Sequence, residues 1–265
     1  MQIFLPIDPQ IQLALVAIFS LIFGSFITLL SHRIISGESI VFTRSKCLGC
    51  ETALTPRNLV PIFSWLFQKG KCSNCKAKIS WRYPLIEASF LISFLTIYFV
   101  LDQKIDIKMI LYFLIVSILI LMCIIDLERY FIPNFLQYLL TILAVILLIS
   151  QGGNSAVFSH LKSAFVYLGF GLALWLFFYV TTTLEAIGVD DLKFFFVAGL
   201  LLGMGNFLAF MMLSGFIGII FGSLWQKIMK DDTFPFAPAI CMSSFACLLF
   251  GSKIDPVILM GKLIF

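Results

Sequence analysis

Charged residues are scarce in this chain of 265 residues, and their scarcity determines the protein class. Only 12% of the residues are charged, whereas 61% are hydrophobic and the mean hydropathy is +1.06. Ordinary soluble domains are about 25% charged and about 45–50% apolar. A single water-soluble core of this size cannot hide thirty phenylalanines. The numbers also exclude a disordered chain, a coiled coil and a secreted disulfide scaffold. The sequence therefore predicts an all-α polytopic membrane protein.

Histidine is also scarce, which narrows the possible chemistry. The chain has two histidines, His32 and His160, and the topology argued below places them on opposite sides of the membrane. A Ser/His pair is therefore not expected, and the chain contains no HExxH zinc-protease sequence. It also has no recognisable glycine-rich loop for a methyl donor. We expect no cleavable signal peptide, because the basic residues follow the first apolar stretch instead of preceding it.

Apolar segments predict about eight transmembrane helices, each needing about 20 mostly apolar residues. The stretch Leu192–Trp225 is too long for one span, and the glycines and asparagine at 203–206 offer a break. The expected spans are residues 11–32, 83–102, 109–126, 134–151, 161–184, 192–204, 206–226 and 236–252. We expect three parts: a first transmembrane helix (1–32), a small cytoplasmic four-cysteine loop domain (33–82) and a helical membrane domain (83–265).

Basic residues cluster in the loop domain. Between Arg33 and Arg82 the chain has nine Lys or Arg and two Asp or Glu, a net charge of +7. With this loop in the cytoplasm and alternating spans, thirteen basic residues face the cytoplasm and five face the other side, as the positive-inside rule requires. The five are Lys104, Lys108, Lys162, Lys253 and Lys262. Contact with anionic membrane lipid is favoured over nucleic acid, and both termini are predicted to lie outside.

Four cysteines of the loop have the spacing of metal ligands. Cys47 and Cys50 form one CxxC pair, and Cys72 and Cys75 form a second. Two such pairs match a tetrahedral four-thiolate zinc site, which would stabilise a loop with little apolar core. Disulfides or redox chemistry are the alternative, but a cytoplasmic loop lies in a reducing compartment. Four thiolates leave no open position on the metal, so the predicted zinc is structural. Cys123, Cys241 and Cys247 are interpreted as small core residues.

Carboxyl groups at three places near the ends of predicted spans, Asp126, the Asp190-Asp191 pair and Glu87, are candidates for chemistry. Asp126 ends an apolar run, and Asp191, preceded by Asp190, opens another span on the same side of the membrane. Two close, partly desolvated carboxylates cannot both ionise easily, so one can hold a proton while the other activates water. The alternative is that each aspartate caps a helix. Glu87, four residues into its span, is interpreted as a structural pair with Arg82 or another basic residue, or as part of a substrate path.

In their order and spacing, the motifs resemble those of the bacterial type IV prepilin leader peptidases, from about Phe19 to Pro238. The matching segments are Phe23-Gly24-Ser25-Phe26 with His32-Arg33; Arg44 to Cys75, including Pro61-x-x-Ser64-Trp65-Leu66; Arg82-Tyr83-Pro84-x-x-Glu87; Asp126-Leu127 with Ile132-Pro133-Asn134; Gly188-x-x-Asp191-x-Lys193 with Gly199 and Gly203; and Pro235-Phe236-x-Pro238.

This resemblance implies an enzyme of the bacterial inner membrane. It implies an aspartic endopeptidase that removes a basic leader from type IV prepilins or type II secretion pseudopilins after a glycine, with Asp126 and Asp191 as the catalytic pair. Many members then methylate the new N-terminus with S-adenosylmethionine. Residues 83–265 would form the peptidase domain, with the zinc loop and both aspartates facing the cytoplasm.

Two positions depart from the family pattern. The family has GxGD where this chain has Asp190 in place of the second glycine, and Thr28 stands where asparagine is usual. Asp190 leaves open a methyltransferase, a peptidase-inactive paralogue, or Asp190 itself as the catalytic carboxylate. Thr28 bears on methyl transfer. A third hypothesis is a non-enzymatic pilus or secretion assembly factor that docks partners through the zinc loop.

Overall fold

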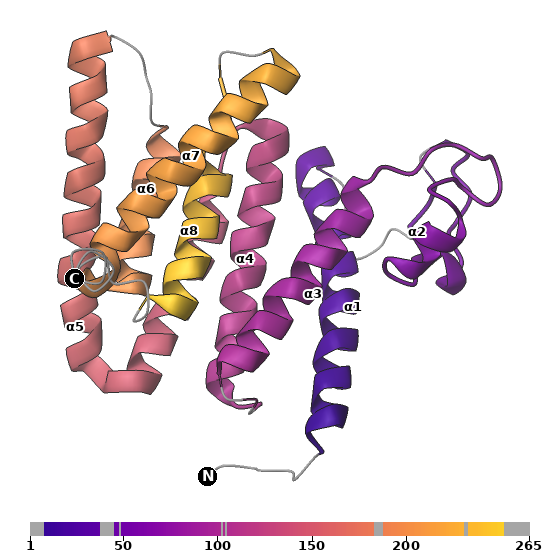
Figure 1. The fold of residues 1–265 in the computed structure, drawn as a ribbon, viewed down its shortest axis with the longest axis horizontal. Coiled ribbons are helices and arrows are strands. Elements are labelled where there is room, and N and C mark those ends of the chain that lie inside the picture. The colour runs from indigo at the N-terminus through magenta and orange to yellow at the C-terminus, as the bar shows by residue number, and fades with distance from the viewer. Residues whose placement is uncertain are drawn as a thin grey trace, which may run out of the picture. The chain divides into compact units, whose positions relative to one another are not determined.

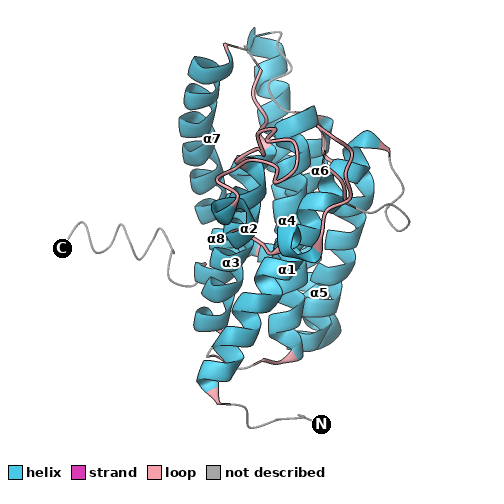
Figure 2. Ribbon diagram, turned by 90° about the vertical axis from the view of Figure 1, so that its right-hand side faces the viewer, coloured by secondary structure: helices cyan, strands magenta, loops and turns pink. Residues whose placement is uncertain are grey.

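The computed structural model describes residues 8–37, 45–47, 49–101, 103, 105–182, 188–230 and 233–251. Arg44 of the loop motif, and Lys104, Lys253 and Lys262 of the charge count, lie outside these residues. The helices are α1 (Pro9–Ser36), η1 (Pro56–Leu59), α2 (Phe63–Phe67), α3 (Arg82–Val100), α4 (Ile107–Arg129), α5 (Asn134–Thr182), α6 (Val189–Leu202), η2 (Met204–Asn206), α7 (Phe207–Met229) and α8 (Ala237–Phe250). The described chain has no strand beyond two isolated bridges, in agreement with the predicted all-α class (Figure 2).

Five of these helices, α1, α3, α4, α5 and α7, are long and apolar enough to cross a membrane, and α8 is a shorter apolar helix. The protein is therefore a multi-pass membrane protein, as the sequence predicts. Each of the eight predicted spans coincides for the most part with a helix or with part of one. Residues 102, 183–184 and 252 of these spans lie outside the described residues. The chain divides into two compact units, residues 1–113 and residues 114–265, here called unit 1 and unit 2.

Helix α5 combines two predicted spans. Its 49 residues would extend about 73 Å if straight, more than twice the hydrocarbon core of about 30 Å. Gly153 breaks the helix with φ 62° and ψ −155°, a conformation that glycine adopts without the steric cost of a side chain. The two arms of α5 run in opposite directions from this bend (Figure 1), so each arm is short enough for one crossing.

Unit 1 is built on the close packing of α1 against α3. Asp8 caps α1 by accepting a hydrogen bond from the Gln10 N–H at 2.8 Å, and Pro9 occupies the first helical turn. Gly24 lets α3 approach, because a Cβ there would lie 3.0 Å from the Cβ of Phe90. Near the other end of α1, the Arg82 guanidinium donates to the Ser31 hydroxyl at 2.9 Å.

Unit 2 holds α6 tightly against α5. A Cβ on Gly199 would lie 2.7 Å from the Cα of Ala164, so the two backbones touch at this point. Below it, the Tyr167 hydroxyl donates to the Gly203 carbonyl at 3.0 Å, and His160 Nδ1 bonds the Leu200 carbonyl at 2.8 Å. The C-terminal end of α6 is therefore fixed against α5, and the first turn, at the other end of the helix, carries the residues of the candidate site.

Gly199→Ala is expected to destabilise unit 2. The added methyl would press on backbone atoms, which cannot move aside without separating α5 from α6, and such overpacking costs about 1–3 kcal/mol. The midpoint of thermal unfolding in detergent is expected to fall. The control is Gly169→Ala, which changes a glycine of α5. A Cβ added at Gly169 would meet nothing within 4 Å, so this variant should leave the midpoint unchanged. Equal midpoints for the two variants would contradict the packing argument.

Candidate active site and cysteine cluster

Asp126 lies in the last turn of α4 and is buried, with 6% of its surface exposed. Its Oδ2 accepts a hydrogen bond at 2.9 Å from the backbone N–H of Ala237, the first residue of α8. Helix α8 begins after Phe236, whose side chain makes no capping hydrogen bond. The first N–H groups of a helix lack partners within it and favour a negative charge. Asp126 therefore caps α8 across 111 residues of sequence.

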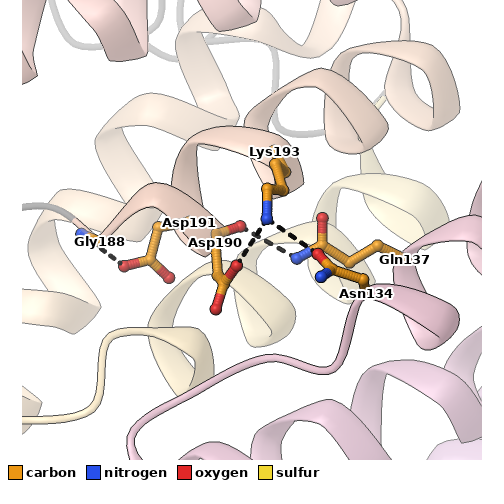
Figure 3. Close-up of polar contacts among 6 residues, drawn as sticks. All are labelled: Asn134, Gln137, Gly188, Asp190, Asp191 and Lys193. Carbon is orange, nitrogen blue, oxygen red and sulfur yellow. Dashed lines mark hydrogen bonds and ion pairs between the residues drawn. The ribbon is translucent and has the colours of Figure 1, made fainter.

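Asp191 lies in the first turn of α6, ahead of that helix's apolar run. Its Oδ2 accepts a hydrogen bond at 3.3 Å from the N–H of Gly188, the residue that precedes the helix (Figure 3). Burial raises the pKa of Asp191 to about 7, and the negative charges of Asp126 and Asp190 contribute to the rise. The structure thus brings Asp126 and Asp191 close enough for the charge of one to act on the other.

Asp190 belongs to a polar network at the same end of unit 2 (Figure 3). Lys193 Nζ donates to Asp190 Oδ1 at 2.9 Å and to Asn134 Oδ1 at 2.8 Å. Gln137 Nε2 donates to the backbone carbonyl of Asp190 at 3.1 Å. These bonds tie the first turn of α6 to the first turn of α5. Asp190 lies within the helix, so this position does not need the left-handed backbone that would favour glycine.

The four loop cysteines form one cluster in unit 1. Their sulfur atoms all lie within 4.8 Å of one another, and Cys47 Sγ and Cys75 Sγ are 3.8 Å apart. Four sulfurs about 2.3 Å from a tetrahedral zinc ion would be separated by about 3.8 Å. All seven cysteines of the chain are free thiols. The cluster can therefore hold a metal ion, and its donor set fits a tetrahedral thiolate site.

The two CxxC turns have the same backbone construction. In the first, Lys46 pairs with Ala53, and in the second Lys71 pairs with Lys78, so each bridge starts one residue before the first cysteine. The residue after the second cysteine has a positive φ in both, 54° at Glu51 and 61° at Lys76. Each turn thereby directs two sulfurs to one side, as a shared ion requires.

Hydrogen bonds favour the thiolate form that metals bind at two of the four cysteines, because they lower the pKa of Cys50 and Cys72, whereas the pKa of Cys75 is raised to about 11. Contacts with Thr52, first with its hydroxyl and then with its backbone, lower the pKa of Cys50 to about 6. The Asn74 side-chain amide also donates to Cys50 Sγ, at 3.7 Å. Both partners belong to the two turns themselves, so the loop itself stabilises the charged form of Cys50.

Comparison with known proteins identifies the chain. Residues 18–101 match the bacterial peptidase A24 N-terminal domain, and residues 113–223 match the type IV leader peptidase family. A prepilin leader peptidase/N-methyltransferase of Bacillus subtilis (strain 168) is 34% identical over 249 residues, covering 92% of this chain and 96% of the relative. The chain belongs to the type IV leader peptidase family. It is therefore a membrane-embedded peptidase.

Other leader peptidases resemble the chain over most of its length. A prepilin leader peptidase/N-methyltransferase of Aeromonas salmonicida (strain A449) is 27% identical over 93% of both chains. Its counterpart in Legionella pneumophila is 29% identical over 82% of this chain and 75% of the relative. No solved structure matches the chain.

Several residues around the aspartates carry roles that the sequence does not reveal. The motif Pro235-Phe236-x-Pro238, known from the sequence only as part of the family resemblance, places the Ala237 N–H against Asp126. Asn134 and Gln137 give no sign in sequence of their contacts with Lys193 and Asp190. Glu87, expected to pair with a basic residue, accepts a hydrogen bond from the backbone N–H of Ile62 at 2.6 Å.

Proposed function

We propose that this leader peptidase is an aspartic endopeptidase in which Asp126 and Asp191 share one proton around a hydrolytic water. Its substrates would be type IV prepilins or type II secretion pseudopilins with a basic leader, cut after a glycine. The observation that carries the proposal is the pair of carboxyl groups, buried at Asp126 and half-buried at Asp191, brought together from α4 and α6 so that the charge of Asp126 acts on Asp191. Two such groups supply a general base and a general acid at once.

The surroundings of the two carboxyl groups support a different role for each in this proposal. The N–H at the start of α8 favours a negative charge on Asp126, so Asp126 takes a proton from the water as it attacks the scissile carbonyl carbon. Asp191, with its pKa near 7, holds the proton and donates it to the carbonyl oxygen. Collapse of the tetrahedral intermediate breaks the C–N bond: the proton on Asp126 goes to the departing amine, and a hydroxyl of the intermediate returns its proton to Asp191.

The proposal also includes a structural metal ion, a methyl donor and an orientation in the membrane. Zinc would be held by Cys47, Cys50, Cys72 and Cys75, which saturate it and give it a structural task. S-adenosylmethionine would be the co-substrate for methylation of the new N-terminus, by analogy with the relatives' names. The zinc loop and the aspartates would face the cytoplasm from a bacterial inner membrane, because the basic residues concentrate on that side.

Cleavage of a prepilin by the purified, reconstituted protein tests the proposal. Mass spectrometry of the product gives both the cut site and any added methyl group. We expect cleavage after the glycine of the leader, and a methylated product when S-adenosylmethionine is present. A product that is cut but never methylated would remove the second activity. A protein that methylates a pre-cut pilin without cutting a leader would be a methyltransferase with an inactive peptidase site.

Asp190→Asn is expected to shift the pH dependence of cleavage toward lower pH. The negative charge of Asp190 is one cause of the raised pKa of Asp191, so removing that charge lowers the pKa of Asp191. The protonated acid is then lost at a lower pH, and the alkaline limb of the kcat/KM profile moves down. The shift is small because burial, the largest cause, does not change. Asp106→Asn, at the far end of α4, should leave the limb in place, and an upward shift in Asp190→Asn would refute this account.

A further inference from the structure

The loop domain carries an exposed apolar surface that neither the metal cluster nor the peptidase site uses. Five apolar side chains of the η1–α2 segment are exposed, and Phe67 has 84% of its surface open. Three of them, Val60, Phe63 and Phe67, line one shallow groove, and Leu59 and Leu66 lie next to these residues in the sequence. We call them the apolar stripe: Leu59, Val60, Phe63, Leu66 and Phe67.

The opposite side of α2 is anchored, so the stripe has a fixed direction. Trp65 packs on Trp81 with ring centroids 4.2 Å apart and donates through Nε1 to the Ile79 carbonyl at 3.2 Å. The Ile62 N–H, at the start of α2, donates to Glu87 in α3 at 2.6 Å. Because α3 is a membrane-crossing helix, this bond fixes α2 and its stripe to the membrane part of unit 1.

Basic side chains surround the stripe in the sequence. Residues 45–81 contain six Lys or Arg and one acid, Glu51, and Arg57, Lys69 and Lys71 on either side of α2 are exposed. Arg57 and Gln68 also line a groove of about 330 Å³ together with Val60, Phe63 and Phe67. An apolar groove with a guanidinium beside it matches a molecule that has a hydrocarbon part and an anionic part.

We propose that the apolar stripe is a membrane-interface segment that binds anionic phospholipid of the surrounding bilayer. The stripe enters the boundary between headgroups and acyl chains, and Arg57, Lys69 and Lys71 contact lipid phosphates. Both ends of the loop join membrane helices, at Ser36 of α1 and Arg82 of α3, so a bilayer surface lies within reach. Trp81, next to the start of α3 and 71% exposed, is a residue type enriched at that boundary.

A binding protein or a nucleic acid fits these observations less well. A nucleic acid would engage the basic residues and leave five apolar side chains in water. Amphipathic segments with basic flanks bind membrane surfaces through buried apolar area together with attraction to anionic lipid. The loop has both features within fifteen positions of sequence, from Arg57 to Lys71.

A photo-crosslinking experiment on the full chain tests the proposal without using catalysis. Benzoylphenylalanine replaces Phe67 in protein reconstituted into vesicles of phosphatidylglycerol and phosphatidylcholine, or of phosphatidylcholine alone. We expect phospholipid adducts at position 67, with more adducts in the phosphatidylglycerol vesicles. The same probe at Lys76, an exposed position of the second cysteine turn, is the matched control. Metal content confirms that each protein is folded.

The basic residues are tested in the same vesicles. Arg57→Gln and Lys69→Gln should reduce the preference for phosphatidylglycerol, since each basic residue near an anionic surface contributes about a fivefold factor to binding. Phospholipid adducts at position 67 no more abundant than at position 76 would overturn the proposal, as would adducts to a second copy of the chain. A variant that combines Arg57→Gln with Lys69→Gln and still prefers phosphatidylglycerol as strongly as the parent would also overturn the proposal.

Discussion

Asp126→Asn and Asp191→Asn should each abolish leader cleavage while leaving a folded protein. The amide can neither take a proton from water nor donate one as a carboxylic acid, so each change removes one half of the proton exchange. General acid–base catalysis contributes about 10²–10⁴-fold to a rate, and loss of either partner should reduce kcat by about 10³-fold or more. The rate is measured as leader cleaved per unit time in lipid vesicles of fixed composition.

Asp106→Asn is the matched control for this prediction. Asp106 precedes α4 and caps it by accepting a hydrogen bond from the Met109 N–H at 2.8 Å. Asparagine caps helices as well as aspartate does, so the change removes a carboxylate from the other end of the same helix at no cost. Cleavage should continue at the normal rate. If Asp191→Asn cleaves normally and Asp190→Asn does not, Asp190 and not Asp191 is the catalytic carboxylate of α6.

Cys72→Ser should release the metal and unfold the loop. Cys72 is the first cysteine of the second turn and is buried, and a serine hydroxyl is a far weaker ligand for zinc than a thiolate. Structural zinc sites in small peptides bind with about 10–16 kcal/mol, so the loop should lose most of its stability with the ion. Metal analysis is expected to give one zinc per parent chain and none in the variant, and protease should cut the loop of the variant first.

Cys247→Ser is the control for the cysteine experiment. This thiol is buried in α8 and does not belong to the loop, so the variant should keep one zinc per chain. Full metal content in both Cys72→Ser and Cys47→Ser would contradict a four-thiolate site. A mass two hydrogens lower than that of the free thiols, in protein purified without metal, would favour the disulfide interpretation.

Features that the bilayer or a short local segment imposes can be predicted from the sequence. The spans are predicted because a bilayer demands long apolar helices with satisfied backbones, and the cysteine set because each CxxC turn is local. The paired depth of Asp126 and Asp191 follows from alternating spans and the charge count. The continuous helix through residue 152 is not predicted, since Gly152 and Gly153 look like a loop in sequence although only Gly153 leaves the helix.

Contacts between residues far apart in the chain leave no recognisable pattern in the sequence. The N–H of Ala237 has no side chain, so nothing in the residue indicates that it meets Asp126. Lys193 and Asn134 are 59 positions apart, and either could as well face solvent. Glu87 was expected to pair with a cation because a buried acid usually needs one, whereas a backbone N–H of the loop meets that need.

The bond from Ala237 has a consequence for inhibitor design. Asp126 Oδ2 already accepts a hydrogen bond from the Ala237 N–H at the start of α8. A compound that binds both carboxylate oxygens must therefore compete with this N–H group as well as with water. Compounds that address only the remaining oxygen avoid that competition. A hydroxyl-bearing peptide isostere small enough to sit on one side of Asp126 should therefore bind better than a bidentate warhead of equal size.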